Sequence, residues 1–381
     1  MIESPLKRLS ALGQSVWFDY IRRDLWQGTD LERLIEQDGL AGMTSNPTIF
    51  EKAIAGTDLY DDDIRRLTAS GLTPTDIVEA LAIADVCGAA DAFRPLYEAT
   101  DGNDGYVSIE VGPQLAHDCA GSVAEARRLW NACNRPNVMV KIPATDEGID
   151  AIRRCLSEGI NINITLLFSV DRYRQVIRAY LEAMEERVAK GQPVDQVRSV
   201  ASFFVSRVDT NVNAKLDVIA ASATSTNHEK ALAAHLRGRV AIANARIAYT
   251  KFEKTFNGTR YEALRRQGVR IQRPLWASTS AKDPSYPELY YVEALIAPNS
   301  IDTMPPETFR TYRDHGHPMI RIHDGISEAH AVFQQLGELR IDEHQVGLDL
   351  EEDGARKFRE SVEKLLSAVH AKERVINAAA R

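Results

Sequence analysis

The most constraining feature of this chain is a series of short apolar runs, each followed by a segment with a helical pattern. We expect strands at residues 15–21, 41–45, 106–111, 138–143, 162–168, 199–205, 273–278 and 299–304. Strands that alternate with helices indicate a parallel sheet, because each parallel connection needs a crossover. Eight such units favour closure of the sheet, which predicts the α/β class and a (β/α)8 TIM barrel with additional helices.

An open, doubly wound sheet is the competing architecture. Nucleotide-binding sheets of that kind carry a glycine-rich phosphate turn after the first strand. The chain contains neither a Gly-x-Gly-x-x-Gly sequence nor a P-loop sequence, so the barrel is favoured. We expect a single barrel domain over 1–381, with helical insertions at about 58–97 and 208–265 and with C-terminal helices.

The last helical segment has a regular amphipathic pattern. Its apolar residues fall on one stripe: Ala355, Phe358, Val362, Leu365, Leu366 and Val369. Such a stripe predicts a helix that packs against the rest of the protein. The pattern does not identify the face of the barrel that the helix covers.

A lone lysine, Lys141, interrupts the apolar run at 138–143. Removal from water disfavours the charged form of an amine, and a neutral lysine is a nucleophile that forms Schiff bases with carbonyl compounds. A lysine at a sheet edge that points to solvent is the alternative interpretation. Other runs carry polar residues at comparable places, namely Asp19, Glu110, Asn163, Thr165 and Ser202, with Arg207 just beyond. Barrel enzymes keep their chemistry at the carboxyl ends of the strands, so these residues predict one site.

Charge and composition exclude several classes of partner. The net charge of −8 is spread along the chain, and no basic cluster suggests binding to nucleic acid or to a membrane surface. No run approaches the roughly 20 apolar residues of a membrane span, and no secretion leader is apparent. The four cysteines are widely spaced, which favours free thiols. We expect a cytoplasmic protein with no metal and no cofactor; association into a homo-oligomer stays open.

Four segments of the chain resemble signature sequences of the transaldolase family. They are Gly42–Phe50, Val138–Thr145, Asn163–Ser169 and Ala201–Asp209, in the order in which the family has them. The tracts Trp276–Pro284 and Thr303–Pro306 are similar to a longer bacterial branch that is sometimes fused to a glucose-6-phosphate isomerase. No such second enzyme fits in this chain. The resemblance covers about residues 10–370.

The resemblance implies a class I, metal-independent barrel enzyme of the non-oxidative pentose phosphate pathway. It would transfer a dihydroxyacetone unit from a ketose phosphate (sedoheptulose 7-phosphate or fructose 6-phosphate) to an aldose phosphate (glyceraldehyde 3-phosphate or erythrose 4-phosphate). A fructose-6-phosphate aldolase, which uses the same lysine and releases dihydroxyacetone, is the alternative. A non-catalytic sugar-phosphate-binding barrel is a remote alternative, because it would have lost at least one of Lys141, Asp19 and Glu110, and all three are present.

The resemblance also assigns catalytic roles. Lys141 matches the Schiff-base lysine, whose protonated imine serves as an electron sink. Asp19 matches the acid that handles the proton of the C4 hydroxyl, a role that requires hydrogen-bond reach. Glu110 and Thr165 match the pair that holds a water for carbinolamine formation and dehydration.

Further positions match substrate-binding residues of the family. Asn46, Asn163 and Ser202 match residues that orient substrate hydroxyls, for which amides and hydroxyls are suited because they donate and accept. Asn46 has an alternative role as a helix cap before Pro47. Phe204 matches an aromatic lining position, although a core aromatic is nearly as consistent with the pattern.

The phosphate contacts are expected from two segments. Arg207 matches a phosphate-binding arginine, whose planar guanidinium suits phosphate oxygens. Shorter family members carry a second arginine soon after the seventh strand, where this chain reads Ser278-Thr-Ser-Ala-Lys282. Lys282 is the expected substitute, with hydroxyl contacts from Ser278 and Ser280; an exposed loop lysine is the alternative.

Overall fold

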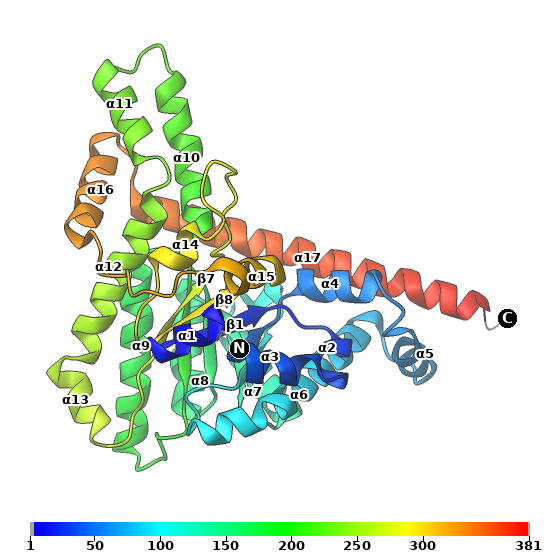
Figure 1. Ribbon diagram of the computed structural model, residues 1–381. Coiled ribbons are helices and arrows are strands. Elements are labelled where there is room, and N and C mark those ends of the chain that lie inside the picture. Colours follow the sequence, from blue (N-terminus) through cyan, green and yellow to red (C-terminus); the bar gives the residue numbers. More distant parts are fainter. Residues whose placement is uncertain (1–3, 380–381) are drawn as a thin grey trace.

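Eight parallel strands form a closed barrel in the computed structural model, which describes residues 4–379 (Figure 1). The strands are β1 (Gln14–Asp19), β2 (Leu40–Thr44), β3 (Tyr106–Glu110), β4 (Val138–Pro143), β5 (Ile162–Leu167), β6 (Ser199–Phe204), β7 (Arg273–Ala277) and β8 (Ser300–Met304). Each strand pairs with the next along the chain, and β8 closes the barrel against β1. The predicted TIM barrel is therefore confirmed, and every predicted strand overlaps an observed one.

Helices surround this barrel. They are α1 (Pro5–Ala11), α2 (Arg23–Gln27), α3 (Asp30–Asp38), α4 (Pro47–Ala55), α5 (Asp61–Ala69), α6 (Pro74–Ala99), α7 (Cys119–Cys133), α8 (Asp146–Glu158), α9 (Val170–Ala189), α10 (Ser206–Ala221), α11 (Asn227–Leu236), α12 (Val240–Phe256), α13 (Thr259–Arg265), α14 (Tyr290–Ala294), α15 (Pro306–His315), α16 (Ile326–Glu338) and α17 (Glu343–Ala379). The range 58–97 holds α5 and most of α6, and the range 208–265 holds most of α10 and all of α11 to α13. Because α6 packs on β2 and β3, it is the crossover helix between them. The description of these helices as insertions in a single domain stays a prediction.

The break between α5 and α6 has a local chemical cause. Gly71 adopts a φ of +80°, which glycine tolerates because it has no Cβ. Thr73 then caps α6: its hydroxyl accepts from the backbone N–H of Asp76, while the Asp76 carboxylate accepts from the backbone N–H of Thr73. With Pro74 at the first helical position, this capping box starts the long helix.

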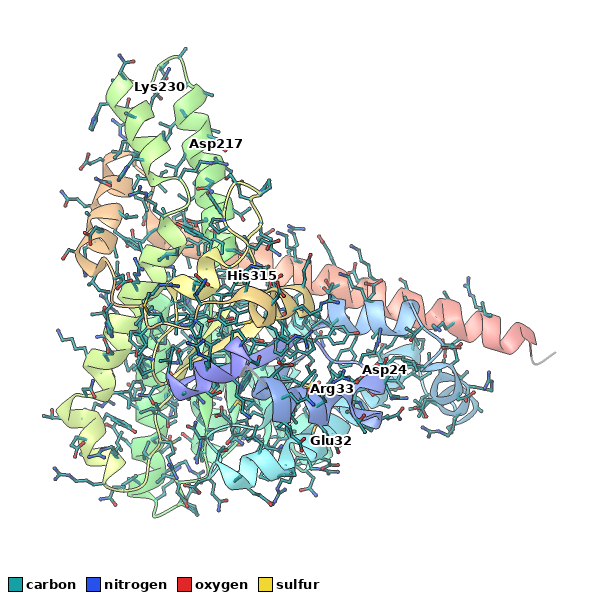
Figure 2. The ribbon with its side chains drawn as sticks, viewed as in Figure 1. Asp24, Glu32, Arg33, Asp217, Lys230 and His315 are labelled. Atoms are coloured by element: carbon teal, nitrogen blue, oxygen red, sulfur yellow. The ribbon has the colours of Figure 1, made fainter. Side chains whose placement is uncertain are left out.

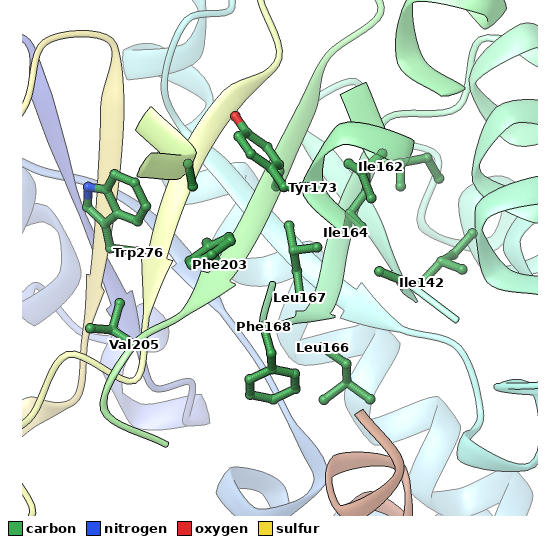
Figure 3. Packing of buried hydrophobic residues seen from close by; sticks show 14 of the residues in the cluster. Ile142, Ile162, Ile164, Leu166, Leu167, Phe168, Tyr173, Phe203, Val205 and Trp276 are labelled. Atoms are coloured by element: carbon green, nitrogen blue, oxygen red, sulfur yellow. The ribbon is translucent and has the colours of Figure 1, made fainter. Parts of the chain in front are cut away.

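Two sets of apolar side chains fill the molecule. On the outer face of the barrel, residues such as Ile164, Tyr173, Phe203 and Trp276 pack between the strands and the surrounding helices (Figure 3). Inside the barrel lies a smaller cluster made of Trp17, Ala41, Tyr106, Met139, Val200, Leu275, Ala277 and Ile301. Residues two apart on a strand share a face, so Trp17, Met139, Val200 and Ile301 lie directly below Asp19, Lys141, Ser202 and Thr303. We call these four apolar residues the inner apolar layer.

Helix α17 crosses the molecule from α10 to α4 (Figure 1). It approaches the barrel closely at Gly354, where an added Cβ would come within 2.7 Å of Cδ2 of Leu166. Leu166 has a φ of +54° at an irregularity in β5 and points toward this helix (Figure 3). A buried ion pair also holds the helix, since Arg172 Nε donates to Glu351 Oε2 at 3.0 Å. Three helices, α15, α16 and α17, follow β8 in the described part of the chain.

Charged side chains stand on the helices that project from the barrel. Helices α10 and α11 project from the barrel and carry charged side chains such as Asp217 and Lys230 (Figure 2). All four cysteines are free thiols. Among the described helices, none combines the length and the apolar character that crossing a membrane would require.

One carboxylate is buried on the outer face of β8. Asp302 has no solvent exposure, and its Oδ1 accepts a hydrogen bond of 2.8 Å from the Thr279 hydroxyl. Its Oδ2 has no partner within residues 4–379. Burial raises the pKa of Asp302 to about 7, because a charged carboxylate is poorly solvated there.

We expect Asp302→Asn to remove part of the pH dependence of stability. Between its ordinary pKa of 3.8 and about 7, the folded protein keeps the Asp302 proton that the unfolded chain has lost. The stabilisation that this proton gives the folded state is complete below pH 3.8. It decreases as the pH rises above 3.8 and is lost once the pH has passed about 7. The variant should therefore gain roughly 2–3 kcal/mol relative to the parent protein between pH 5 and pH 8.

Urea unfolding of both proteins at the two pH values measures this difference. Glu351, whose pKa burial also raises to about 7, titrates in both proteins and cancels. Thr279→Val is a second variant: it removes the hydrogen-bond donor that lowers the pKa of Asp302, so the loss of stability with rising pH should continue to a higher pH than in the parent protein. Parallel pH profiles of parent and Asp302→Asn would contradict the assignment.

Candidate active site

A cavity of about 590 Å³ opens at the carboxyl ends of the barrel strands. Of the residues predicted for the site, it is lined by Asp19, Asn46, Glu110, Lys141, Thr165, Ser202, Phe204, Arg207, Ser278 and Lys282. Ser280 lines it as well. Asn163 is absent from its wall. The cavity has the size of a small-molecule site and the position at which barrel enzymes carry out their reactions.

Lys141 lies deep in this cavity with only 7 % of its surface exposed. Its Nζ donates to the backbone oxygen of Ser45 at 3.0 Å and is 2.9 Å from Oε1 of Glu110. Glu110 is the register partner of Lys141 on the neighbouring strand, which brings the two side chains together. Burial raises the pKa of Glu110, while the Lys141 cation opposes that rise. Nearly removed from water, the amine is paired with a group that can exchange protons.

Asp19 ends β1 at another side of the same cavity. Its Oδ1 accepts a hydrogen bond of 2.8 Å from the Thr44 hydroxyl, and Nδ2 of Asn46 is 3.5 Å away. Asn46 also caps α4, because its Oδ1 accepts from the backbone N–H of Ile49 at 3.0 Å. That bond turns the amide N–H₂ toward Asp19. The capping role therefore supports a place in the site instead of competing with it.

Asn163 lies behind the cavity wall. It is completely buried, its Oδ1 accepts from the Ser202 hydroxyl at 2.6 Å, and its Nδ2 donates to Ser108 Oγ at 3.0 Å. The amide is held by two strands at once, and it orients the hydroxyl of Ser202, which does line the cavity.

Arg207 stands in the first turn of α10, with its guanidinium 5.1 Å from the centre of the Phe204 ring. No carboxylate of the described residues lies within 4 Å of its nitrogens, so its charge is available to an anion. Burial lowers the pKa of Arg207, and nearby carboxylates oppose this effect. Phe204 in turn packs on Phe168 with ring centres 5.1 Å apart. It is thus both a lining residue and a core aromatic.

The loop after β7 reaches the same end of the cavity. Ser278 has a φ of +57°, and its Oγ is 3.0 Å from the hydroxyl of Ser206, the first residue of α10. The loop is thereby tied to the helix that carries Arg207. Lys282 lies on the cavity wall beyond Ser278 and Ser280. An anion at the N-terminus of α10 would meet Arg207 from one side and this loop from the other.

A family model described as Transaldolase/Fructose-6-phosphate aldolase matches residues 16–369 of the chain. The chain belongs to this family. Curated relatives include a transaldolase of Acidothermus cellulolyticus, 46 % identical over 368 residues that cover 96 % of each chain. A transaldolase of Frankia alni is 45 % identical over 97 % of each chain, and a transaldolase 2 of a Nostoc species is 41 % identical over 98 % of each.

Several residues of this transaldolase-family site were not expected from the sequence. Thr44 donates to Asp19, and Ser45 accepts from Lys141. Both directly precede Asn46 in a segment that resembles a family signature. Their position at the carboxyl end of β2 could therefore have identified them as site residues from the sequence. From α17, Gly354, Lys357, Phe358 and Ser361 also line the cavity. Nothing local in the sequence marks them as site residues.

The contacts of α17 complete the rim of the transaldolase-family site. Ser361 Oγ accepts from the Thr48 hydroxyl at 2.9 Å, which joins α17 to α4. Lys357 pairs with Asp353 at 2.6 Å. Within residues 4–379, no group of three or more His, Cys, Asp or Glu side chains is arranged to hold a metal ion.

Proposed function

We propose that this protein is a transaldolase that transfers a dihydroxyacetone unit between a ketose phosphate and an aldose phosphate. Sedoheptulose 7-phosphate or fructose 6-phosphate would be the donor, and glyceraldehyde 3-phosphate or erythrose 4-phosphate the acceptor. The observation that carries this proposal is the buried amine of Lys141, 2.9 Å from Glu110 and in one cavity with Asp19 and Arg207. The names of its relatives at 41–46 % identity support it. The cytoplasmic location stays a prediction, and association into a homo-oligomer stays open.

In the first stage, Nζ of Lys141 attacks the C2 carbonyl of the ketose. The carbonyl oxygen takes up one proton while the amine loses one, which gives a carbinolamine; a second proton, delivered to its hydroxyl, then lets water leave and gives the protonated imine. Glu110 is the proposed carrier of these protons because it lies beside Nζ and because burial raises its pKa toward the range where it can give and take them. Thr165, on the same cavity wall, is the proposed second partner of the departing water.

In the second stage, Asp19 takes the proton of the C4 hydroxyl. The C3–C4 bond breaks, its electron pair moves toward the imine nitrogen, and an aldose phosphate leaves while an enamine stays on Lys141. An acceptor aldehyde then forms a new bond at C3, and Asp19 returns the proton to its oxygen. Water finally hydrolyses the imine. The 2.8 Å bond from Thr44 orients the Asp19 carboxylate for this task.

Arg207 and Lys282 are the proposed phosphate contacts, and their replacement tests this. We expect Arg207→Ala to lower kcat/KM for fructose 6-phosphate by about 10- to 100-fold, the range of a lost charge-assisted contact. Lys282→Ala should have a smaller effect in the same direction. Both effects should fall on KM and should vanish when unphosphorylated fructose is the donor. Equal losses with fructose would remove the two residues from the phosphate site.

Borohydride trapping with fructose 6-phosphate, followed by peptide mapping, tests the proposed function. A dihydroxyacetone-derived adduct on Lys141 that diminishes when erythrose 4-phosphate is added would support a transferase with a Schiff base. An adduct that acceptor does not change, with free dihydroxyacetone accumulating, would assign the chain to the aldolase branch of the family. Absence of the adduct in folded protein, alongside a working control enzyme, would refute the mechanism.

A further inference from the structure

The hydrogen bond from Thr44 to Asp19 has a second hydroxyl behind it. Oγ1 of Thr44 lies 2.8 Å from Oδ1 of Asp19 and 3.2 Å from Oγ1 of Thr303. Thr44 belongs to β2 and Thr303 to β8, the two strands that flank β1 in the barrel. The contact between the two threonines therefore spans the strand that carries Asp19, and Thr303 also lines the cavity.

The number of protons determines the direction of each bond in this chain of hydroxyls. An ionised carboxylate only accepts hydrogen bonds, and a threonine hydroxyl has a single proton. While Asp19 is ionised, as its role as a proton acceptor requires, the proton of Thr44 is used on Asp19. The oxygen of Thr44 must then accept at its second contact, so Thr303 is the donor there. The hydrogen bonds run from Thr303 to Thr44 and from Thr44 to Asp19.

The two threonines are shielded from water. Thr44 is 3 % exposed and Thr303 is 4 % exposed. The inner apolar layer closes them off from below: Ile301 lies beneath Thr303, and the ring of Trp17 fills the space at Gly42, where an added Cβ would come within 2.6 Å of it. Water therefore cannot replace the donor from that side, since Trp17 and Ile301 are completely buried.

The donor behind Thr44 strengthens the hold on Asp19. A hydroxyl that accepts a hydrogen bond donates a stronger one, because each bond in a chain polarises the next. Thr303 also keeps the proton of Thr44 from turning away from Asp19. Oδ1 of Asp19 is held in this way, while Oδ2 accepts no hydrogen bond from residues 4–379 and is left for the C4 hydroxyl. Because its own proton is used on Thr44, Thr303 cannot donate to the sugar at the same time.

We propose that Thr303 is a positioning residue for the transfer reaction, which acts through Thr44 to hold the Asp19 carboxylate in the orientation that takes the C4 proton. The inference rests on the proposed function, because it concerns the cleavage of the carbon–carbon bond. It assigns Thr303 no part in imine formation, since in the described part of the chain neither Lys141 nor Glu110 hydrogen-bonds to either threonine.

Steady-state kinetics of Thr303→Val with fructose 6-phosphate and erythrose 4-phosphate test the inference. Valine has nearly the shape of threonine and suits a strand, but it has no hydroxyl. We expect kcat to fall about 3- to 10-fold, the effect of one lost hydrogen bond, while the KM for fructose 6-phosphate changes by less than about 2-fold. Borohydride should still trap the three-carbon adduct on Lys141. Thr303→Ser keeps the donor and should restore kcat to within about 2-fold of the parent protein.

A double-mutant cycle tests whether Thr303 acts through Thr44. Once Thr44→Val has removed the link to Asp19, Thr303→Val should lower kcat by less than about 2-fold further, whereas independent roles would multiply the two losses. Ser300→Ala is the matched control on the same strand. It removes a buried hydroxyl that bonds to Gln14 and to the backbone oxygen of Ala297, outside the cavity lining, and it should keep the kcat of the parent protein.

Several results in an active parent protein would overturn the inference. They are an unchanged kcat in Thr303→Val, an equal loss in Thr303→Ser or in Ser300→Ala, and a loss by the same factor in the Thr44→Val background. A higher KM without a fall in kcat would place Thr303 in substrate binding and would overturn the inference as well. An inactive parent protein with no adduct on Lys141 would instead refute the proposed function, and this inference with it.

Discussion

Replacement of Lys141 by arginine is expected to abolish borohydride trapping and to lower the rate of transfer on the order of 10⁴-fold or more. Arginine keeps a cation beside Glu110, 2.9 Å from Nζ in the parent protein, but its guanidinium does not form the imine. The variant should therefore fold with nearly unchanged stability. Mass spectrometry of the trapped peptides and a coupled assay of aldose phosphate release measure the two effects.

Lys141→Met separates the chemical role of the lysine from its structural role. It leaves Glu110 without its cation in a buried place, which costs up to about 3–5 kcal/mol of unfolding free energy. The double variant Lys141→Met with Glu110→Gln removes both charges and should regain much of that loss while staying inactive. Substantial activity in Lys141→Arg, or an adduct on another residue, would contradict the role assigned to Lys141.

Replacement of Asp19 by asparagine should slow transfer by about 10²- to 10⁴-fold, the range of general acid–base catalysis, and should leave imine formation intact. The asparagine Oδ1 can still accept from Thr44, so the local geometry is expected to persist. Because the C3–C4 bond can no longer break efficiently, borohydride should trap the whole six-carbon sugar phosphate on Lys141. The parent protein should instead give the three-carbon adduct.

The mass of the Asp19→Asn adduct decides this interpretation. Thr44→Val serves as the control, since it removes only the hydrogen bond to Asp19 and should cause a smaller loss with a three-carbon adduct. A three-carbon adduct in Asp19→Asn at the rate of the parent protein would show that another group handles the C4 proton.

The barrel and much of the site were open to prediction because their signals are local in sequence. Each strand is a contiguous apolar run, and a polar residue at its carboxyl end must reach the same mouth once the sheet closes. Lys141, Glu110 and Asp19 follow this rule. Lys282, chosen for its charge in the loop after β7, also reaches the cavity, although its role stays a prediction.

Other features depend on contacts between distant segments and had no such signal. The stripe on α17 predicted packing, and Ala355, Leu365 and Val369 are buried, but it could not identify Leu166 as the partner of Gly354. Asn163 resembled a substrate contact, yet its amide is used between Ser108 and Ser202. Which polar side chains hydrogen-bond to each other, and so are withdrawn from the cavity, depends on how the strands are placed beside one another, and the sequence of a single strand does not contain this information.

The position of α17 has a consequence for the synthesis of this protein. The last barrel strand ends at Met304, whereas Ser361, which completes the rim of the cavity, follows 57 residues later. At ordinary rates of translation, this interval lasts roughly 3–11 s. A nascent chain would thus have every strand of its barrel before it has a complete substrate pocket. Lys141 would therefore not lie in a fully formed cavity until the chain has been extended through Ser361.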